Sequence, residues 1–430
     1  MKTERKNTRE ISRRKFITTV GLAAGASGMS AFFPMITSAK QIDRHTELKL
    51  GLLLPNSTIY PRMGANLNAG MQLYFNHSAA GKSGRQVEII EEDIGVSPRR
   101  AVQKAEKLIV ESGVEMLTGL IDPAVCSELG TVCEENNTFL VASQVGADIQ
   151  RAHDHNPFII HNSLGYWQSN WAIGNWAAKN IGKRALVTAS FFESGYDALY
   201  AFNLGFERGG GQVVHTRIDN HESDSINTAD LYSAIHRYKP DLVFAGYHGQ
   251  ASIDLIKNFR QSAFAGKIPL LASGFMMDDP AIAGLGSEAA GIKSCLPWSA
   301  VSDQSESIHF RSEFRKQFGY EADIFAVLGF DTAHLISNAL DASAGYPRNI
   351  PQMLNAFAAA QFDRQSGPLN RESGTPENPY TLFLRESESV EGKLHNRVVG
   401  RLFPDKKIKQ DIQLTQATLK TGFLNPYLCA

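Results

Sequence analysis

The chain has 430 residues, which is more than one ordinary hydrophobic core accommodates and enough for two lobes. Apolar residues make up 43% of the chain and charged residues 20%, as is usual for globular proteins. The formal net charge of −1 argues against a nucleic-acid partner and against an acidic polymer as ligand.

Residues 1–39 have the layout of a cleaved export signal. A basic region is followed by an apolar, Gly- and Ala-rich stretch over 20–33, and small residues at 37–39 suit a signal peptidase. Arg13 and Arg14, ahead of the apolar stretch, predict export by the twin-arginine machinery. The alternative is a membrane anchor, but the stretch is shorter than the roughly 18 apolar residues that a span requires. We therefore expect a periplasmic protein that is soluble after cleavage.

The four cysteines are Cys126, Cys133, Cys295 and Cys429, and the periplasm permits disulfides. Cys126 and Cys133 are expected on one helix, where their spacing corresponds to roughly 10 Å. That separation exceeds the roughly 7 Å limit for a bridge, so we expect buried free thiols at these two positions. The state of Cys295 and Cys429 stays open.

The first half of the mature chain alternates predicted strands and helices. The apolar runs that predict strands lie at 48–54, 87–90, 116–119 and 139–142. The helices between them repeat one spacing, as in Leu67, Met71, Tyr74 and Phe75. The same spacing recurs from Ala101 and from Val125. This alternation predicts a mainly parallel sheet with helices on both faces.

A second unit of the same kind begins at 158–160, ahead of a helix that carries Trp167, Trp171 and Trp176. Strands are predicted at 185–188, from 213, at 241–245 and at 269–272, with helices near 196–208 and 250–263. The fold class is therefore α/β, with two doubly wound parallel-sheet lobes.

The last third of the chain differs. Helices are predicted near 304–318, 323–343 and 350–360, a connection over 366–379, and a closing hairpin from 381–384 and 398–399. Helices that follow the second sheet would complete the first lobe, and the chain would then cross a hinge more than once. We expect lobe I at 46–162 and 298–365, and lobe II at 163–297 and 366–430.

The chain lacks the common catalytic signatures, namely a G-x-S-x-G elbow, H-E-x-x-H and a phosphate-binding loop. Gly209, Gly210 and Gly211 follow a predicted helix and are interpreted as its end. The segment 153–155 could bind a metal, but we favour a solvated turn there. The carboxylates at 91–93 are interpreted as the end of a strand and not as a catalytic pair. We expect neither enzymatic activity nor a cofactor or metal. An exported enzyme is a weaker alternative, because twin-arginine export favours proteins that fold before transport.

Ligands of open α/β sheets bind outside the carboxyl ends of the strands, so the loops there are the candidate site. They contain aromatic, hydroxyl and amide side chains, which suit solute capture, although ordinary loop polarity is the alternative for each. Asp122 could face a cation, but an Asp followed by Pro123 is also a preferred helix start. The predicted ligand-binding residues are Met63, Asp122, Ser143, Gln144, Tyr196, Tyr247, His248 and Phe275.

The order and spacing of several motifs resemble the leucine/isoleucine/valine-binding class of type I periplasmic solute-binding proteins. The segments concerned are 51–55 with Gly64 and Gly70, Glu92-Asp93 with 97–101, 119–143, Gly195-Tyr196, 239–247, 318–320 and 329–333. The resemblance covers nearly all of the mature chain. It implies two lobes that close on a solute, a three-segment hinge, and delivery to an ABC permease and ATPase complex in the inner membrane.

The resemblance also implies where amino-acid binders hold their ligand, and this chain departs from that pattern. In the amino-acid binders, three polar residues hold the carboxylate and ammonium groups of the ligand. The matching positions here lie near Pro123, Ala147 and Phe275, and Met63 replaces a tyrosine. A buried zwitterion without partners is unfavourable by several kcal/mol, so a more apolar or aromatic acid or amide fits better than a plain aliphatic amino acid. A receptor subunit that signals to a partner is the alternative to transport.

Overall fold

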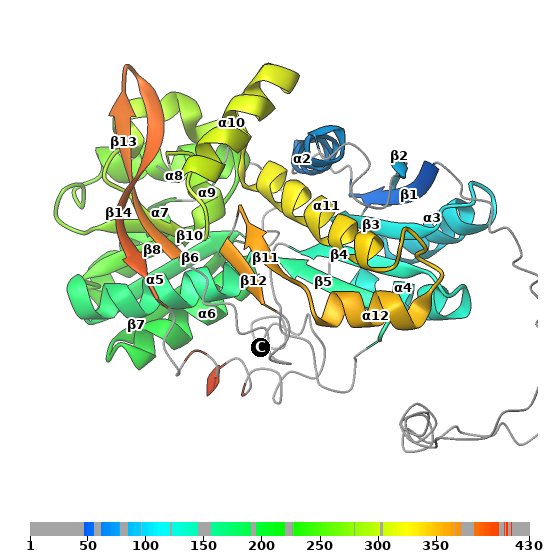
Figure 1. Ribbon diagram of the computed structural model, residues 1–430. Coiled ribbons are helices and arrows are strands. Elements are labelled where there is room, and N and C mark those ends of the chain that lie inside the picture. The colour runs from blue at the N-terminus through cyan, green and yellow to red at the C-terminus, as the bar shows by residue number, and fades with distance from the viewer. Residues whose placement is uncertain are drawn as a thin grey trace, which may run out of the picture. The chain divides into compact units, whose positions relative to one another are not determined.

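The computed structural model describes most of the chain after residue 46 (Figure 1). The described residues are 47–55, 62–77, 85–95, 97–120, 123–144, 156–190, 195–219, 226, 228–278, 280–301, 304–365, 367–370, 382–403, 408, 410, 411 and 414. Residues 45–430 form one unit by their contacts, and the predicted export signal lies outside the described residues. Within the described part, no helix has the length and apolar character to cross a membrane.

Lobe I is built on a five-stranded parallel sheet in the order β2-β1-β3-β4-β5. Its strands are β1 (Glu47–Leu54), β2 (Gln86–Asp93), β3 (Met116–Leu120), β4 (Phe139–Gln144) and β5 (Ile159–Ser163). The helices between them are α2 (Met63–His77), α3 (Pro98–Val110) and α4 (Pro123–Glu135). The central strand β3 is buried along its whole length, as the continuous apolar runs predicted.

Lobe II is built on a seven-stranded sheet in the order β14-β13-β10-β9-β8-β6-β7. Its strands are β6 (Arg184–Ser190), β7 (Gln212–Asp219), β8 (Leu242–Gly246), β9 (Leu270–Ala272), β10 (Lys293–Leu296), β13 (Leu382–Val390) and β14 (Lys393–Leu402). The first five are parallel, and the predicted hairpin of β13 and β14 adds an antiparallel edge. Both lobes therefore have the α/β class expected from the sequence.

The helices of lobe II include three that the sequence pattern did not predict. They are α5 (Tyr166–Asn180), α6 (Gly195–Arg208), α7 (Thr228–Tyr238), α8 (Gly249–Gln261), the short α9 (Gly274–Asp278) and the 3-10 segment η1 (Pro280–Ala289). The three are α7, α9 and η1. α7 lies between β7 and β8 and buries Leu231, Ala234 and Ile235. Gly209, Gly210 and Gly211 follow α6, as interpreted from the sequence.

Three helices that follow β10 return to lobe I, as predicted. They are α10 (Ser305–Phe318), α11 (Ile324–Ala342) and α12 (Ile350–Ala358), and Figure 1 shows α11 next to α2. The expectation that 366–379 is only a connection was wrong at its start, because β12 (Gly367–Asn370) pairs with β11 (Gln361–Arg364). Pro368 is tolerated there because a two-stranded ribbon consists of edge strands.

Along its described elements, the chain passes between the two sheets three times: after β5, after β10 and between β12 and β13. Repeated passages of this kind are typical of a hinge between lobes. The lobe boundaries stated above remain predictions, since the third passage includes residues outside the described part.

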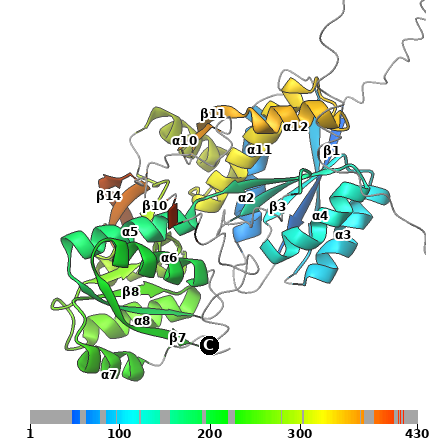
Figure 2. The same cartoon turned by 90° about the horizontal axis from the view of Figure 1, so that it is seen from below.

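In each lobe, two helices pack closely through glycines. A Cβ atom on Gly70 of α2 would lie 1.9 Å from the carbonyl oxygen of Ala326, and one on Gly329 of α11 would lie 1.9 Å from that of Leu67. In lobe II, α5 and α6 lie side by side (Figure 2), and Gly205 approaches the backbone of Trp171 in the same way. These glycines allow helix backbones to touch where any side chain would separate them.

The prediction of free thiols at Cys126 and Cys133 is confirmed, and Cys295 is free as well. All three are buried, and burial raises the pKa of Cys133 and of Cys295 to about 12. These thiols therefore behave as small apolar groups. Cys429 lies outside the described residues.

Candidate functional site

Ser143, near the carboxyl end of β4, belongs to a buried hydroxyl network in lobe I. Its Oγ lies 2.7 Å from Oγ1 of Thr332 on α11, which also accepts a bond of 2.9 Å from Nδ2 of Asn162. The Thr332 hydroxyl donates its single proton to the carbonyl oxygen of Leu328, at 2.7 Å. Ser143 must therefore be the donor to Thr332, which leaves its oxygen lone pairs for another donor.

Asp331, the neighbour of Thr332, binds a second chain segment that leads to a passage between the lobes. Oδ1 of the buried Asp331 accepts a hydrogen bond of 2.7 Å from the backbone N–H of Gln365, just before β12. Asn162 lies at the end of β5, just before the first passage to lobe II. Adjacent residues of α11 thus bind chain segments that lead to two of the three passages. This gives a physical role to the 329–333 motif noted in the sequence.

Tyr247 follows β8 and forms the centre of a polar network in lobe II. Its hydroxyl donates to Oδ2 of Asp219 at 2.6 Å and lies 2.5 Å from Oγ1 of Thr188. Asp219 forms an ion pair with Arg217, whose guanidinium also reaches Thr188. Burial, with the nearby Asp219 carboxylate, raises the pKa of Tyr247, so its side chain is a neutral phenol.

Phe275 lies on α9 and stacks with two other aromatic rings. Its ring centroid is 4.0 Å from that of Tyr166, with an interplanar angle of 22°. On another side it stacks with Phe325, at 5.6 Å and 27°. Tyr166 begins α5, whereas Phe325 lies in the first turn of α11. These three rings, called here the aromatic wall, therefore join elements of both lobes at the carboxyl edge of the lobe II sheet.

Two half-buried carboxylates lie near this wall. Asp323 caps α11 by accepting hydrogen bonds from the backbone N–H groups of Phe325 and Ala326, and it accepts a third from Asn66 at 2.5 Å. Burial raises the pKa of Asp323 to about 6, and the charge of Asp278 contributes to the increase. Burial also raises the pKa of Asp278, against the opposing effect of its ion pair with Arg385.

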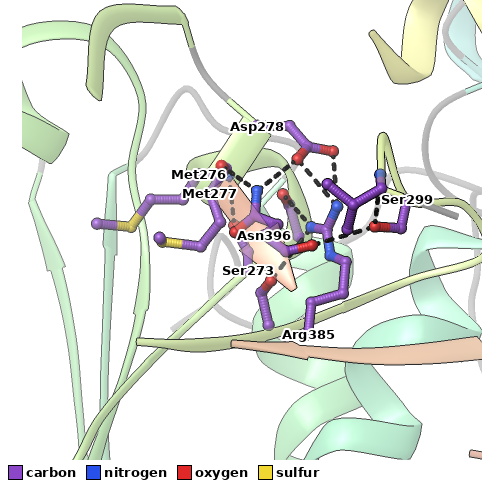
Figure 3. Close-up of polar contacts among 10 residues, drawn as sticks. Ser273, Met276, Met277, Asp278, Ser299, Arg385 and Asn396 are labelled. Carbon is purple, nitrogen blue, oxygen red and sulfur yellow. Dashed lines mark hydrogen bonds and ion pairs between the residues drawn. The ribbon is translucent and has the colours of Figure 1, made fainter. Parts of the chain in front are cut away.

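Figure 3 shows the polar contacts around Asp278 and Arg385. Arg385 is 1% exposed and comes from β13, while Asp278 ends α9. Two hydrogen bonds, of 2.9 and 3.0 Å, join Nη1 of Arg385 to the two carboxylate oxygens of Asp278. Asn396 of β14 donates to the same carboxylate at 3.0 Å. The strand hairpin of lobe II is therefore tied to the helix that presents Phe275.

The structure places the predicted site residues in different surroundings. Met63 begins α2 and is half-buried, and His248 is the N-cap residue of α8, with an extended backbone. Ser143, Tyr247 and Phe275 are buried and belong to the three separate groups described above. Gln144 ends β4 and Tyr196 lies in α6, but their side chains, and all of Asp122, lie outside the described residues. Ligand contact by any of the eight stays a prediction.

Several residues of the site were not predicted from the sequence. Asp323, directly before an apolar helix, carried a recognisable helix-start signal. Tyr166 and Phe325 are aromatic residues at helix starts, for which sequence pattern alone indicates only packing. Arg385 carried no signal, because an arginine in a predicted edge hairpin is ordinarily exposed. Among the described residues, no group of three or more His, Cys, Asp or Glu side chains could hold a metal ion.

The chain is similar to known binding proteins over most of its length. The sequence model of a family described as periplasmic binding protein matches residues 47–386. The Leu/Ile/Val-binding protein homolog 6 of Brucella melitensis biotype 1 is 23% identical over 379 residues, which cover 86% of this chain and 94% of the relative.

Two solved structures are similar as well. A solute-binding protein of an ABC transporter from R. palustris, in complex with benzoate, is 26% identical with a TM-score of 0.71, over 84% of this chain and 98% of that one. A second, from Rhodopseudomonas palustris BisB5 in complex with 3,4-dihydroxybenzoic acid, is 23% identical with a TM-score of 0.74, over 85% and 99%. The two-lobed α/β fold described above is shared across these proteins.

Proposed function

Because the chain belongs to the periplasmic binding protein family, we propose that it is the extracytoplasmic solute-binding component of an ABC transporter. The observation that carries the proposal is the aromatic wall, in which Phe275 on α9 meets Tyr166 and Phe325. The wall lies where open α/β sheets bind their ligands, and it is formed by elements of both lobes. A solute bound there would favour the closed arrangement of the lobes.

The proposed ligand is a small organic solute that is amino-acid-like or, more consistently with the wall, an aromatic or apolar acid or amide. Phe275 occupies the position where the family resemblance implies an acidic partner for an ammonium group. Phe325, the partly exposed ring of the wall, supports the aromatic class, since ring stacking adds about 0.5–1.5 kcal/mol to the burial of a ring. The benzoate and dihydroxybenzoate complexes of the two similar proteins support the same class.

A thermal-shift screen of residues 40–430 against aromatic acids, amides, amino acids and short carboxylates tests this function. A ligand at a hundred times its dissociation constant should add about 2.7 kcal/mol to the free energy of unfolding. We expect stabilisation by an aromatic acid. Stabilisation by leucine or valine alone would reject the aromatic class but keep the binding function. A screen without any stabilising solute would count against solute capture.

Phe275→Leu and Phe264→Leu provide a matched pair of variants for the screen. Phe264 also belongs to lobe II, and its ring contacts among the described residues are with Tyr232 and His236, which lie outside the aromatic wall. We expect Phe275→Leu to reduce the thermal shift caused by an aromatic acid and Phe264→Leu to leave it unchanged. Equal shifts in both variants would place the ligand elsewhere.

Export to the periplasm by the twin-arginine machinery belongs to the same proposal. Its support is the sequence of residues 1–39, in which Arg13 and Arg14 precede an apolar stretch and small residues follow it. Replacing both arginines by lysine should leave the protein in the cytoplasm in precursor form, whereas Arg5→Lys should not affect export. Periplasmic localisation of the double variant would contradict this route.

The proposed partners are the permease and ATPase of the transporter. The proposal also assigns no catalytic activity to the chain itself. The family to which the chain belongs is one of solute-binding proteins, which supports both points. In reconstituted vesicles, the loaded protein should stimulate ATP hydrolysis by its transporter. Stimulation of a signalling partner, without transport, would favour a sensory receptor.

A further inference from the structure

The helix that carries Phe275 is too short to hold its own position. α9 comprises five residues, Gly274–Asp278, which is little more than one turn. The first N–H and last C=O groups of a helix have no partners within it, so a single turn is stabilised mainly by surrounding groups. Two local bonds of 3.3 Å are present, from the N–H of Met276 to Oγ of Ser273 and from the N–H of Met277 to the carbonyl oxygen of Ser273. Most of the support for α9 must come from elsewhere in the fold.

The guanidinium of Arg385 supports α9 at both of its ends. At the end of the helix, Nη1 donates to the Asp278 carboxylate. At the start, Nη2 donates to the carbonyl oxygen of Gly274, at 3.1 Å, and also to Oγ of Ser294 on β10, at 3.1 Å. The planar fork of an arginine suits such divided contacts, and lysine lacks it. Burial protects these bonds from competition by water.

Asn396 of β14 adds a second support from the same hairpin. Its Nδ2 donates to the carbonyl oxygen of Met277, at 2.8 Å, and to Asp278. The pairing of β13 with β14 shifts register between Leu384 and Arg385. Such irregularities redirect side chains, and Figure 3 shows Arg385 and Asn396 converging on α9. The hairpin follows the third passage between the lobes, far along the chain from α9.

We propose that Arg385 is the positioning residue of the aromatic wall: its guanidinium, more than α9 itself, fixes the ring of Phe275 against Tyr166 and Phe325. The inference rests on the proposed function for its role in solute binding. Its structural part, the placement of Phe275, can be tested without any ligand. Phe275 touches the solute in this scheme, whereas Arg385 acts only through Phe275.

The ligand-free test uses 19F NMR of the protein with 4-fluorophenylalanine at position 275. In Arg385→Lys, and in the isosteric Asp278→Asn, we expect the resonance to move toward that of a solvent-exposed label or to broaden. Arg260→Lys is the matched control, because Arg260 also binds backbone carbonyls in lobe II, at Glu288 and Ala290 of the η1 region. An unchanged resonance in both Arg385→Lys and Asp278→Asn overturns the proposal. If Arg385→Lys does not fold, the resonance of Asp278→Asn alone tests the proposal.

The binding test is a double-mutant cycle with benzoate as the probe, measured by calorimetry. We expect Arg385→Lys to weaken binding about tenfold when Phe275 is present and less than about twofold in the Phe275→Leu background. Equal losses in the two backgrounds would show that Arg385 acts independently of Phe275 and would overturn the positioning role. If the wild type does not bind benzoate, that ligand is rejected, and the 19F result alone decides the placement of Phe275.

Discussion

The hydroxyl groups of Ser143 and Thr332 lie 2.7 Å apart in a fully buried contact between β4 and α11. Thr332 also accepts from Asn162, so Thr332→Val removes the shared acceptor of two polar side chains while keeping the volume. We expect this variant to lower the free energy of unfolding by about 1–3 kcal/mol. Urea denaturation measures the change. Thr216→Val, on the half-buried edge strand β7, is the control and should stay within about 0.5 kcal/mol.

Gly329→Ala tests the contact between α2 and α11. An alanine in a helix interior normally stabilises it by about 1 kcal/mol relative to glycine. Here the new methyl group would meet the backbone carbonyl of Leu67, which cannot move without displacing α2. We therefore expect destabilisation by about 1–3 kcal/mol, which is the opposite sign. Gly284→Ala, whose added Cβ would meet no atom within 4 Å beyond its own chain neighbourhood, is the control. Stabilisation of Gly329→Ala in thermal unfolding would contradict the close packing.

The half-buried carboxylate of Asp323 should give the stability a measurable dependence on pH. Its pKa is about 6 in the folded protein, compared with 3.8 for an unperturbed carboxyl group. The folded state therefore takes up a proton before the unfolded state does as the pH falls. The penalty for burying the charge is present above about pH 6 and is lost as the pH falls toward 4. The groups facing Asp323 are Asp278, Asn66 and Tyr320, with Arg62 stacked over Tyr320.

The measurement compares the wild type with Asp323→Asn, because asparagine also caps helices but does not titrate. Between pH 7 and pH 4, the free energy of unfolding of the wild type should rise by about 2–3 kcal/mol relative to the variant. Denaturation at a series of pH values gives this difference. A constant difference, or one that falls at low pH, would show that Asp323 is not the half-buried acid described here.

Asp411, near the end of the described part of the chain, binds two side chains of lobe II. Its fully buried carboxylate accepts from Nε1 of Trp171, at 3.0 Å, and forms an ion pair with Arg208. Arg208 is half-exposed and can be solvated, so the main loss in Asp411→Ala is the acceptor of the buried indole N–H. We expect the free energy of unfolding to fall by about 1–3 kcal/mol. Asp254→Ala, whose carboxylate accepts an exposed bond from Gln250, should change it by less than about 0.5 kcal/mol.

The local spacing of apolar residues was sufficient to predict most of the helices and strands. The strand of residues 48–54 and the helix bearing Leu67, Met71 and Tyr74 were predictable, because burial on one face imposes a period that is visible in a short window. α7 was missed, although Leu231, Ala234 and Ile235 follow the same rule over a shorter segment. The pairing of β12 with β11 was missed because Pro368 and the glycines around it indicate a loop to any local criterion.

The candidate site shows the limit of such inference. The sequence identified Phe275 as a departure from the family that the chain resembles. It also predicted that the site lies in the loops at the carboxyl ends of the strands. Its partners Tyr166 and Phe325 lie far from it along the chain, and Arg385 is 107 residues from Asp278. Contacts of this kind depend on how the lobes, the hinge and the β13–β14 hairpin are assembled.

The sequence by itself therefore determined the α/β class, the tandem units and the edge of the sheets where a ligand is expected, since periodic burial and turn residues act locally. Only the tertiary structure decided that Arg385 supports α9, that Thr332 binds Ser143 and Asn162, and that three aromatic rings meet between the lobes. A buried polar group is stable only where the packed fold brings its partner within hydrogen-bonding distance, and no spacing along the chain encodes that distance.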